Sequence, residues 1–339
     1  MTVAQRGPLA LLDSPADLLR SLFGTANTDS KENEVSQSSV VGWLTLVAIL
    51  LLGAVQAFAV SSFGDIARYL DNKPGNVGVR HDIKAAGRDI IKALHDSDRY
   101  DRIVIVGHSL GSIIGLDMIT SYWAQVHDHP GHPVSIDQDR LKEVEKLGTT
   151  ITAEDPAYSS AQRDLWLEQR ALGIPWLLTD FISVGSPLSH ADWLMADGRV
   201  PLEELFTRRE LLHNPPQVDG PGHPYSFPIS YATQAGERSL YVLHHAAAFA
   251  CTRWTNIWFP TRWGLFDDPF GGPLADLFGI GVMDRPVTAG PWSPRYLPVL
   301  AHVMYWRKPD PDPDPEHPDG HHITLLRWAL DLDSDDWLK

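Results

Sequence analysis

Residues 107–111 read GHSLG, with a serine between two glycines. The preceding residues 102–106 are mostly β-branched, which is typical of a strand buried in a parallel sheet, and residues 113–123 have a helical pattern. Between a strand and a helix, the glycines allow a sharp turn that projects the Ser109 hydroxyl above the sheet, and they leave room for the helix to pack closely. The helix start also supplies N–H groups where a negatively charged oxygen would develop. We therefore predict a nucleophilic serine on an elbow. The elbow residues are Gly107, His108 and Gly111.

The neighbouring segments alternate between helical and strand patterns. Residues 80–94 predict a helix, and two short apolar runs at 181–184 and 256–259 predict strands. The apolar positions expected on one face of that helix are Ile83, Ala86, Ile90 and Leu94. This alternation predicts an α/β fold with a mainly parallel sheet flanked by helices. Residues 187–253 are rich in proline, glycine and histidine, and we expect them to form loops or a cap over the sheet edge.

Composition excludes some classes of protein. The chain of 339 residues has 28 basic and 43 acidic side chains and a formal net charge of −15, so it lacks the basic surface that nucleic-acid binding requires. Its hydrophobic fraction of 43% is that of a globular protein. The single cysteine, Cys251, rules out an intrachain disulfide framework and suits a reducing compartment.

Residues 40–60 form an uncharged apolar run. As a helix these 21 residues would be about 31 Å long, close to the hydrocarbon thickness of a bilayer. The run starts too late and is too long for a signal peptide, so we predict a transmembrane helix, with a buried core helix as the alternative. Arg20 and Lys31 are the basic side chains among the twenty residues before the run, whereas Arg68, Lys73 and Arg80 lie in the twenty residues after it. The positive-inside rule then places the C-terminal domain in the cytoplasm.

The predicted organisation has three parts. Residues 1–39 form an amphipathic and polar N-terminal segment, with a short helix starting near Ser14 and a loop at 27–39. The transmembrane helix follows, and residues 61–339 form the α/β domain. Within that domain, 309–320 is a Pro/Asp run that cannot hold a helix, and we expect an exposed loop there, with an acidic cation site as the alternative.

The chain resembles the α/β-hydrolase superfamily, and more closely a group of membrane-anchored bacterial hydrolases of lipase or esterase type. The resemblance covers roughly residues 61–308. The matching stretches are YDRIVIVGHSLGS at 100–112, FGDIARYL at 63–70, TDFISVGSPL at 179–188 and WTNIW at 254–258. The resemblance implies hydrolysis of an ester-like acyl bond through a Ser–Asp–His triad, without a metal or organic cofactor.

The family pattern also implies where the oxyanion of the reaction is bound. The backbone N–H of Leu110 carries over as one donor of the oxyanion hole. Relatives place a strand and a His-Gly loop, which supplies the second donor, before the membrane segment. Nothing in residues 1–40 reads as such a strand and loop, so we expect the first strand or strands of the fold to be missing from this chain.

The same family order places the acid, and then the base, after Ser109. Asp268 is the first choice for the acid because it follows a predicted strand and opens the turn Asp-Pro-Phe-Gly-Gly, with Asp267 and Asp284 as alternatives. His302 is the first choice for the base, because similar proteins carry the base before an aromatic pair. The alternatives for the base are His321 and His322.

Two other patterns resemble functional motifs but do not predict a metal site or a second nucleophile. His127, His129 and His132 lie in a Pro/Gly loop without a cysteine partner or helical spacing, so we expect no metal site there. Gly185-Ser186-Pro187 is not a second elbow, because the proline lacks the N–H that an oxyanion needs. We expect it near the site rather than in it.

The sequence therefore predicts a cytoplasm-facing serine hydrolase on a single membrane helix. Membrane proximity favours a lipid or another hydrophobic acyl ester as the substrate. The alternative is a membrane-anchored scaffold or binding protein on a degenerate hydrolase fold. The absence of a recognisable oxyanion loop is the feature that favours this alternative.

Overall fold

A computed structural model describes residues 34–131, 137–148, 150–151, 155–218, 225–233, 236–260, 268–288, 300–307 and 321–331. The chain divides into two compact units, Met1–Gln56 and Ala57–Lys339. The second unit contains every strand of the described residues and all of the predicted site. The predicted short helix near Ser14 and the Pro/Asp run at 309–320 lie outside the described residues.

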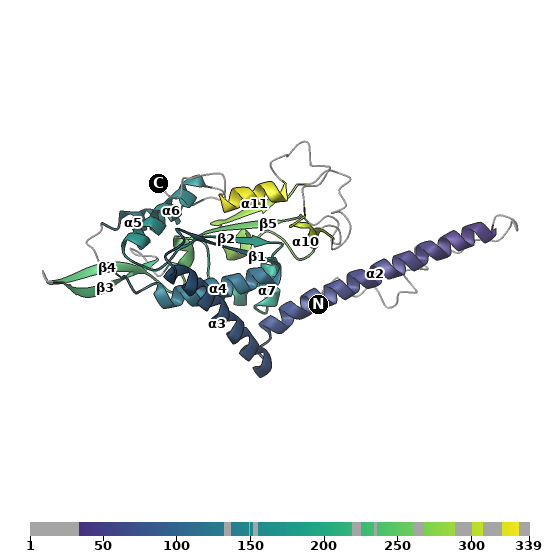
Figure 1. Ribbon diagram of the computed structural model, residues 1–339, viewed down its shortest axis with the longest axis horizontal. Helices are drawn as coiled ribbons and strands as arrows, with labels where there is room; N and C mark the ends of the chain where they lie inside the picture. The colour runs from purple at the N-terminus through teal and green to yellow at the C-terminus, as the bar shows by residue number, and fades with distance from the viewer. Residues whose placement is uncertain are drawn as a thin grey trace, which may run out of the picture. The chain divides into compact units, whose positions relative to one another are not determined.

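The secondary structure alternates as expected from the sequence (Figure 1). The helices are α2 (Glu34–Leu70), α3 (Pro74–Asp96), α4 (Leu110–Val126), α5 (Asp139–Gly148), α6 (Pro156–Ala171), α7 (Ala191–Leu194), α8 (Arg199–Thr207), α9 (Ala275–Phe278), α10 (Leu300–Met304) and α11 (His322–Leu330), with 3₁₀ turns η1 (Pro187–His190) and η2 (Ala248–Ala250). The strands are β1 (Ile103–His108), β2 (Leu178–Val184), β3 (Ser226–Thr233), β4 (Gly236–Leu243), β5 (Arg253–Trp258) and β6 (Val282–Pro286).

The main sheet has four strands within the described residues, in the order β1-β2-β5-β6, and all of its pairings are parallel. This confirms the predicted α/β class with a mainly parallel sheet. The strands and η2 within 187–253 show that the region is not a set of loops alone. It contains η1, α7, α8 and an antiparallel hairpin of β3 and β4.

Helices cover both faces of the sheet. Alternate residues of each strand point to opposite faces, so each strand contributes side chains to the packing on both sides. On β2, Phe181 packs in a large core with residues of α3, α4 and α6, which also holds the buried Cys251. Ile182 and Val184 pack on the other side with Tyr305 and residues of α11. Figure 1 shows α3 and α4 on one side of the sheet and α11 on the other. Every residue of β2 is buried, as expected for a parallel strand covered on both faces, although the strand includes the polar residues Thr179, Asp180 and Ser183.

Two sequence expectations about burial are wrong in part. Strand β1 is not buried throughout: it lies at the end of the described sheet order, and Val106 is 37% exposed. On α3 the predicted positions Ile83 and Leu94 do pack against the core, but Ile90 is 59% exposed, and Ile91 is buried in its place. Gly87 is buried beside Met118 of α4, and a Cβ at this position would lie 2.5 Å from Met118 Cγ, so α3 and α4 approach each other closely here.

Polar contacts to Asp117 of α4 come from the C-terminal end of α2 and from α3. Tyr69 donates a hydrogen bond of 2.8 Å to Asp117 of α4, and Arg80 and Lys84 of α3 form ion pairs of 3.1 and 2.9 Å with the same carboxylate. At its other end α2 includes residues 34–39, which were expected in a loop. Among the residues that the structure describes, no helix has both the length and the hydropathy of a membrane span.

Candidate active site

Ser109 lies at the turn between β1 and α4 in a backbone conformation that few residues adopt. Its φ is 54° and its ψ is −129°, in the positive-φ region that costs an L-residue free energy. The turn is held on both sides: the Ser109 N–H donates to Val184 O at 3.1 Å, and Ser109 O accepts from Ser112 N at 2.9 Å. The conformation directs the chain from strand to helix within a single residue.

The two glycines of the elbow have different roles. A Cβ at Gly107 would lie 2.6 Å from Gly111 O and 2.6 Å from Ser112 Cα, so this position needs glycine. At Gly111 no atom lies within 4 Å of the place of a Cβ, so the prediction that both glycines make room for the helix is wrong for Gly111. Close packing of α4 on the sheet depends instead on Gly115, where a Cβ would approach Phe181 to 2.9 Å.

His302 is buried on the short helix α10 and lies against Ser109. Its Nε2 is 2.9 Å from Ser109 Oγ, and its Nδ1 is 3.0 Å from Asp268 Oδ1. Its backbone oxygen accepts a hydrogen bond of 2.8 Å from Nε2 of His108, the residue before the serine. The elbow therefore holds both the side chain and the main chain of His302.

Asp268 is fully buried and hydrogen-bonded at both oxygens. Oδ1 accepts from His302 and from the Phe270 N–H at 2.9 Å, and Oδ2 accepts from the Tyr305 hydroxyl at 2.7 Å. Burial alone would raise the pKa of this carboxyl, but the bonds from His302, Tyr305 and Phe270 outweigh it and hold the pKa below its usual value. Asp268 is thus an anion at neutral pH, and Nδ1 of His302 carries a proton toward it. Nε2 then faces Ser109 Oγ as the acceptor of its proton.

Two glycines form a close-fitting wall around the Asp268 carboxylate. Gly185 has a φ of 52°, and a Cβ there would lie 2.8 Å from Asp268 Oδ2 and 2.6 Å from Tyr305 Cε2. A Cβ at Gly271 would lie 2.9 Å from the same oxygen. Gly185 directly follows β2, so the edge of the sheet fixes the position of the acid.

The structure places the alternative candidates elsewhere. Asp284 lies on β6 and accepts hydrogen bonds from Asn256 and from the N–H groups of Leu274 and Ala275, so it holds a loop. Asp267 lies outside the described residues. At the start of α11, His321 Nδ1 accepts from the Ile323 N–H, and His322 Nε2 donates to Arg307 O.

The loop histidines are held by other contacts. His127 is buried and donates through Nδ1 to Leu243 O at 2.8 Å, while Nδ1 of the largely exposed His129 is 2.6 Å from an Asp128 oxygen. His132 is outside the described residues. In the described part of the chain, no group of histidine, cysteine, aspartate and glutamate side chains is arranged to hold a metal ion.

Sequence reasoning missed Tyr305, which donates to Asp268, and it placed Ser186 near the site without predicting its contact. Tyr305 lies three positions after His302, on the same side of a helical turn. This spacing could have indicated that Tyr305 lies next to the base. Ser186 contacts Ser112 of α4 at 2.6 Å between their hydroxyl oxygens, which ties the loop after β2 to the elbow. Its place after a parallel strand, at the same sheet edge as Ser109, could have indicated this contact.

The surroundings of Ser109 and His302 suit acyl transfer. Leu110 is the first residue of α4, where N–H groups have no partner within the helix and can donate to an oxyanion. On the other side, the ring of Phe270 lies 4.6 Å from the His302 ring, and the Phe63 ring of α2 lies 4.7 Å from Phe270. These rings keep water from one side of the imidazole.

Comparisons of the chain with protein families, with characterised proteins and with solved structures find no match.

Proposed function

We propose that the chain is a serine hydrolase that cleaves an ester-like acyl bond of a hydrophobic substrate. One observation carries the proposal: an unbroken line of hydrogen bonds runs from Ser109 Oγ through the His302 ring to Asp268. Its members are 193 and 34 positions apart in the sequence, so only the fold brings them together. The resemblance of the surrounding motifs to α/β hydrolases of lipase or esterase type agrees with this proposal.

The reaction proceeds in two halves. Ser109 Oγ attacks the ester carbonyl carbon while His302 Nε2 takes the hydroxyl proton, and the carbonyl oxygen becomes an oxyanion near the Leu110 N–H. The intermediate collapses, the bond to the alcohol oxygen breaks, and His302 donates the proton to the leaving alcohol. Water, deprotonated by His302, then attacks the acyl-enzyme, and the carboxylic acid leaves as Ser109 regains its proton.

Asp268 acts on this reaction through His302. Its anionic carboxylate holds the proton on Nδ1, so that Nε2 faces the serine as a base. It also stabilises the imidazolium that forms in both halves. The low pKa of Asp268 keeps the carboxylate charged across the neutral range.

A fluorophosphonate probe tests the proposal, because it reacts covalently with an activated serine. The full chain should be labelled, and Ser109→Ala should not be. Serine and histidine of a triad act as a unit, so each loss should lower ester turnover by about 10⁶. His302→Ala should therefore be labelled far more slowly than wild type. Ser121→Ala is a matched control, because Ser121 lies on the same helix, where its hydroxyl accepts from Arg88.

Equal labelling of wild type and Ser109→Ala refutes the assignment of the nucleophile. A folded wild-type chain that neither reacts with the probe nor hydrolyses an ester would instead be a binding or scaffold protein.

A further inference from the structure

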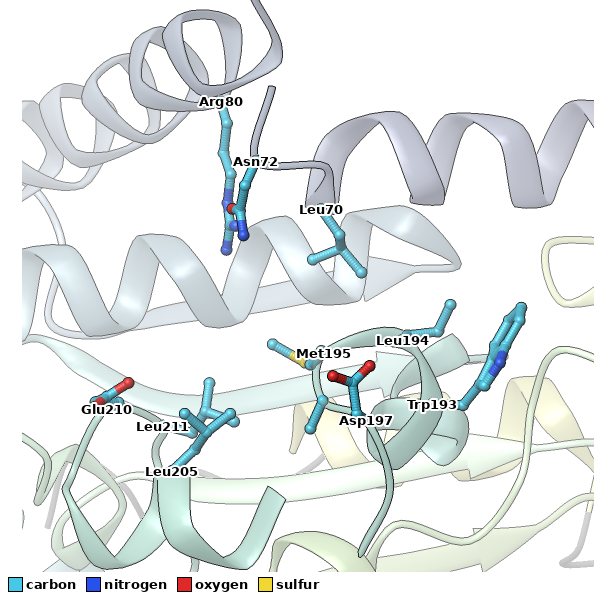
Figure 2. A pocket seen from close by; sticks show the side chains of 11 residues that line it. Leu70, Asn72, Arg80, Trp193, Leu194, Met195, Asp197, Leu205, Glu210 and Leu211 are labelled. Atoms are coloured by element: carbon cyan, nitrogen blue, oxygen red, sulfur yellow. The ribbon is translucent and has the colours of Figure 1, made fainter. Parts of the chain in front are cut away.

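The base of the triad lies in close-packed surroundings. The cavity in Figure 2, of about 480 Å³, lies between the end of α2 and α3 on one side and α7 and α8 on the other, and none of the three triad residues lines it. His302, in contrast, is only 3% exposed and packs directly against other side chains. Its position therefore depends on these direct contacts.

The helix that carries His302 is too short to be stable by itself. α10 has five residues, Leu300–Met304, which make little more than one helical turn. Helices of this length form in water only when tertiary contacts hold them. The main chain of His302 must therefore be held in place by neighbouring segments.

His108, the residue directly before the nucleophile, provides such a contact. Its Nε2 donates a hydrogen bond of 2.8 Å to the backbone oxygen of His302. Because a carbonyl oxygen can only accept, the proton of the neutral His108 ring is on Nε2. The ring lies 4.9 Å from the ring of His302. It also meets the rings of Tyr305 and Trp306 edge to face, at 5.6 and 5.9 Å. One side chain thus contacts three residues of the segment that carries the base.

Two consecutive residues of the elbow hold two different parts of His302. Ser109 Oγ lies 2.9 Å from Nε2 of the imidazole, while His108 holds the backbone oxygen. The elbow is itself fixed, because the Ser109 N–H donates to Val184 O and Ser109 O accepts from Ser112 N. The contacts form a closed loop from the elbow through the imidazole to the main chain of His302 and back. A shift of α10 relative to the elbow must break one of these contacts, so the loop fixes the distance between Oγ and Nε2.

The ring of His108 is neutral at pH 7. Burial lowers the pKa of His108, and the neighbouring His302 lowers it further, whereas the bond to His302 O and the charge of Asp268 act in the opposite direction with less effect. The neutral state matters because His302 becomes a cation in both halves of the reaction. A second cation with its ring 4.9 Å away would oppose that ionisation. A neutral His108 holds the base without lowering its basicity.

We propose that His108 is a positioning residue, which acts through His302 by holding the main chain of the base against the elbow. The assignment rests on the proposed hydrolase function and adds a role for the side chain before the nucleophile. The hydrogen bond from His108, rather than the packing of its ring, then sets the rate. The loss should appear in kcat and not in KM, because His108 holds the base and not the substrate.

Two substitutions in the full chain separate the hydrogen bond from the packing of the ring. His108→Phe keeps an aromatic ring but has no donor. It should lower kcat for p-nitrophenyl butyrate by about 10- to 100-fold, with KM within about twofold, because a small misplacement of a catalytic group is costly. His108→Gln loses the ring but has an amide N–H that can replace Nε2–H, and it should keep kcat within about threefold of wild type.

The pH profile of kcat/KM gives a readout that a merely structural role would not change. Its acidic limb reports the ionisation of the base in the free enzyme. The limb should stay in place in His108→Phe and His108→Gln, because neither substitution changes the charge beside His302 at neutral pH.

His127→Phe is the matched control. His127 is a buried histidine that also donates to a backbone oxygen, Leu243 O at 2.8 Å, but it makes no contact with the triad. Its loss should lower the melting temperature and leave kcat near wild type. If His108→Phe does not fold, as judged by circular dichroism, His108→Met takes its place, since methionine is close to glutamine in length and has no donor.

A kcat near wild type in His108→Phe overturns the positioning role. An equal loss of kcat in His108→Phe and His108→Gln also overturns it, because the donor is then not what the reaction needs. A displaced acidic limb would show that His108 acts through its charge, which contradicts the proposal as well. In these three cases wild type is active and the hydrolase function stands. A wild-type chain that neither hydrolyses an ester nor reacts with the fluorophosphonate overturns the hydrolase function and the role of His108 together.

Discussion

The hydroxyl of Tyr305 donates a hydrogen bond of 2.7 Å to Asp268 Oδ2 and accepts one of 2.9 Å from the Phe259 N–H. Asp268 Oδ1 meanwhile faces His302. Tyr305 thus connects the acid to the chain that leaves β5, and it does so from the same segment that carries the base. Tyr305 is therefore one of the contacts that set the relative positions of acid and base, together with the Phe270 N–H.

Tyr305→Phe should lower kcat by about 10- to 100-fold with little change in KM, because a hydrogen bond to a charged group contributes roughly 1.5–3 kcal/mol. The measurement is steady-state hydrolysis of a soluble ester. Tyr122→Phe is the control, since Tyr122 is a buried tyrosine on α4 whose hydroxyl donates to Pro175 O. Equal activity of Tyr305→Phe and wild type would show that the Phe270 N–H and the packing around Asp268 suffice to hold the acid.

Replacing the buried Asp268 and the partly buried Asp284 should have different effects. Asp268→Asn reverses the tautomer preference of His302 and should lower kcat by about 10⁴ with a small change in melting temperature. Asp284→Asn should lower the melting temperature, because Asp284 accepts from the N–H groups of Leu274 and Ala275, while kcat below that temperature stays near wild type. Comparison of kcat with thermal unfolding for both variants checks this, and loss of activity in a stable Asp284→Asn would contradict it.

Gly185→Ala should impair the reaction without touching the nucleophile. The new methyl group would enter the space of Asp268 Oδ2 and Tyr305 Cε2, and the positive φ adds strain. We expect kcat to fall by at least tenfold and the free energy of unfolding to fall by about 1–3 kcal/mol. Urea unfolding and ester turnover measure the two effects. Gly111→Ala is the matched control, because a methyl group there meets no atom within 4 Å.

Glu168 should make the stability of the fold depend on pH near neutrality. Its carboxylate accepts from the Arg140 and Leu141 N–H groups at the start of α5, and burial raises its pKa from 4.5 to about 7. Between pH 4.5 and about 7 the folded state therefore binds more protons at Glu168 than the unfolded state does. The free energy of unfolding consequently falls as the pH rises through this range.

Relative to Glu168→Gln, wild type should therefore lose up to about 3 kcal/mol of unfolding free energy between pH ~4.5 and ~8. Urea unfolding followed by tryptophan fluorescence at several pH values gives the difference. A difference that is constant with pH, or that grows in favour of wild type as pH rises, would contradict the raised pKa.

The location of the chain in the cell stays a prediction from residues 40–60. The full chain should sediment with membranes and dissolve only in detergent, and a C-terminal reporter should be active in the cytoplasm. Leu44→Lys and Leu50→Lys provide a sharper test, since both leucines are more than half exposed, at 64% and 63%. A lysine on a water-exposed surface costs little, whereas at the centre of a bilayer it costs about 2.5–3.5 kcal/mol. Recovery of the wild-type chain without detergent would contradict insertion.

The elbow could be predicted from the sequence because its signals are local. A β-branched run, two glycines around a serine and a helical pattern follow one another within 102–123. The sequence does not clearly distinguish Asp268 from Asp284 as the acid. Both follow or form strands at the sheet edge, and only the folded chain brings Asp268, rather than Asp284, to His302.

Contacts between distant segments explain what the sequence could not predict. The helix at 80–94 has apolar residues at both 90 and 91, and periodicity alone does not say which one is buried. In the structure Ile91 is buried together with Gly87, which lies against Met118 of α4, and the sequence of α3 does not contain the position of that neighbouring helix. The exposure of Val106 likewise depends on which strands flank β1, which its own residues do not encode.

The single thiol of the protein, Cys251, is buried, and burial raises its pKa well above the usual range. A thiol reagent should therefore leave the folded protein unmodified, because the thiolate is the reactive form. The rate of modification then measures how often the core opens. A cysteine introduced on the surface would also be the sole site for a fluorescent or spin label, with no need to remove the native one.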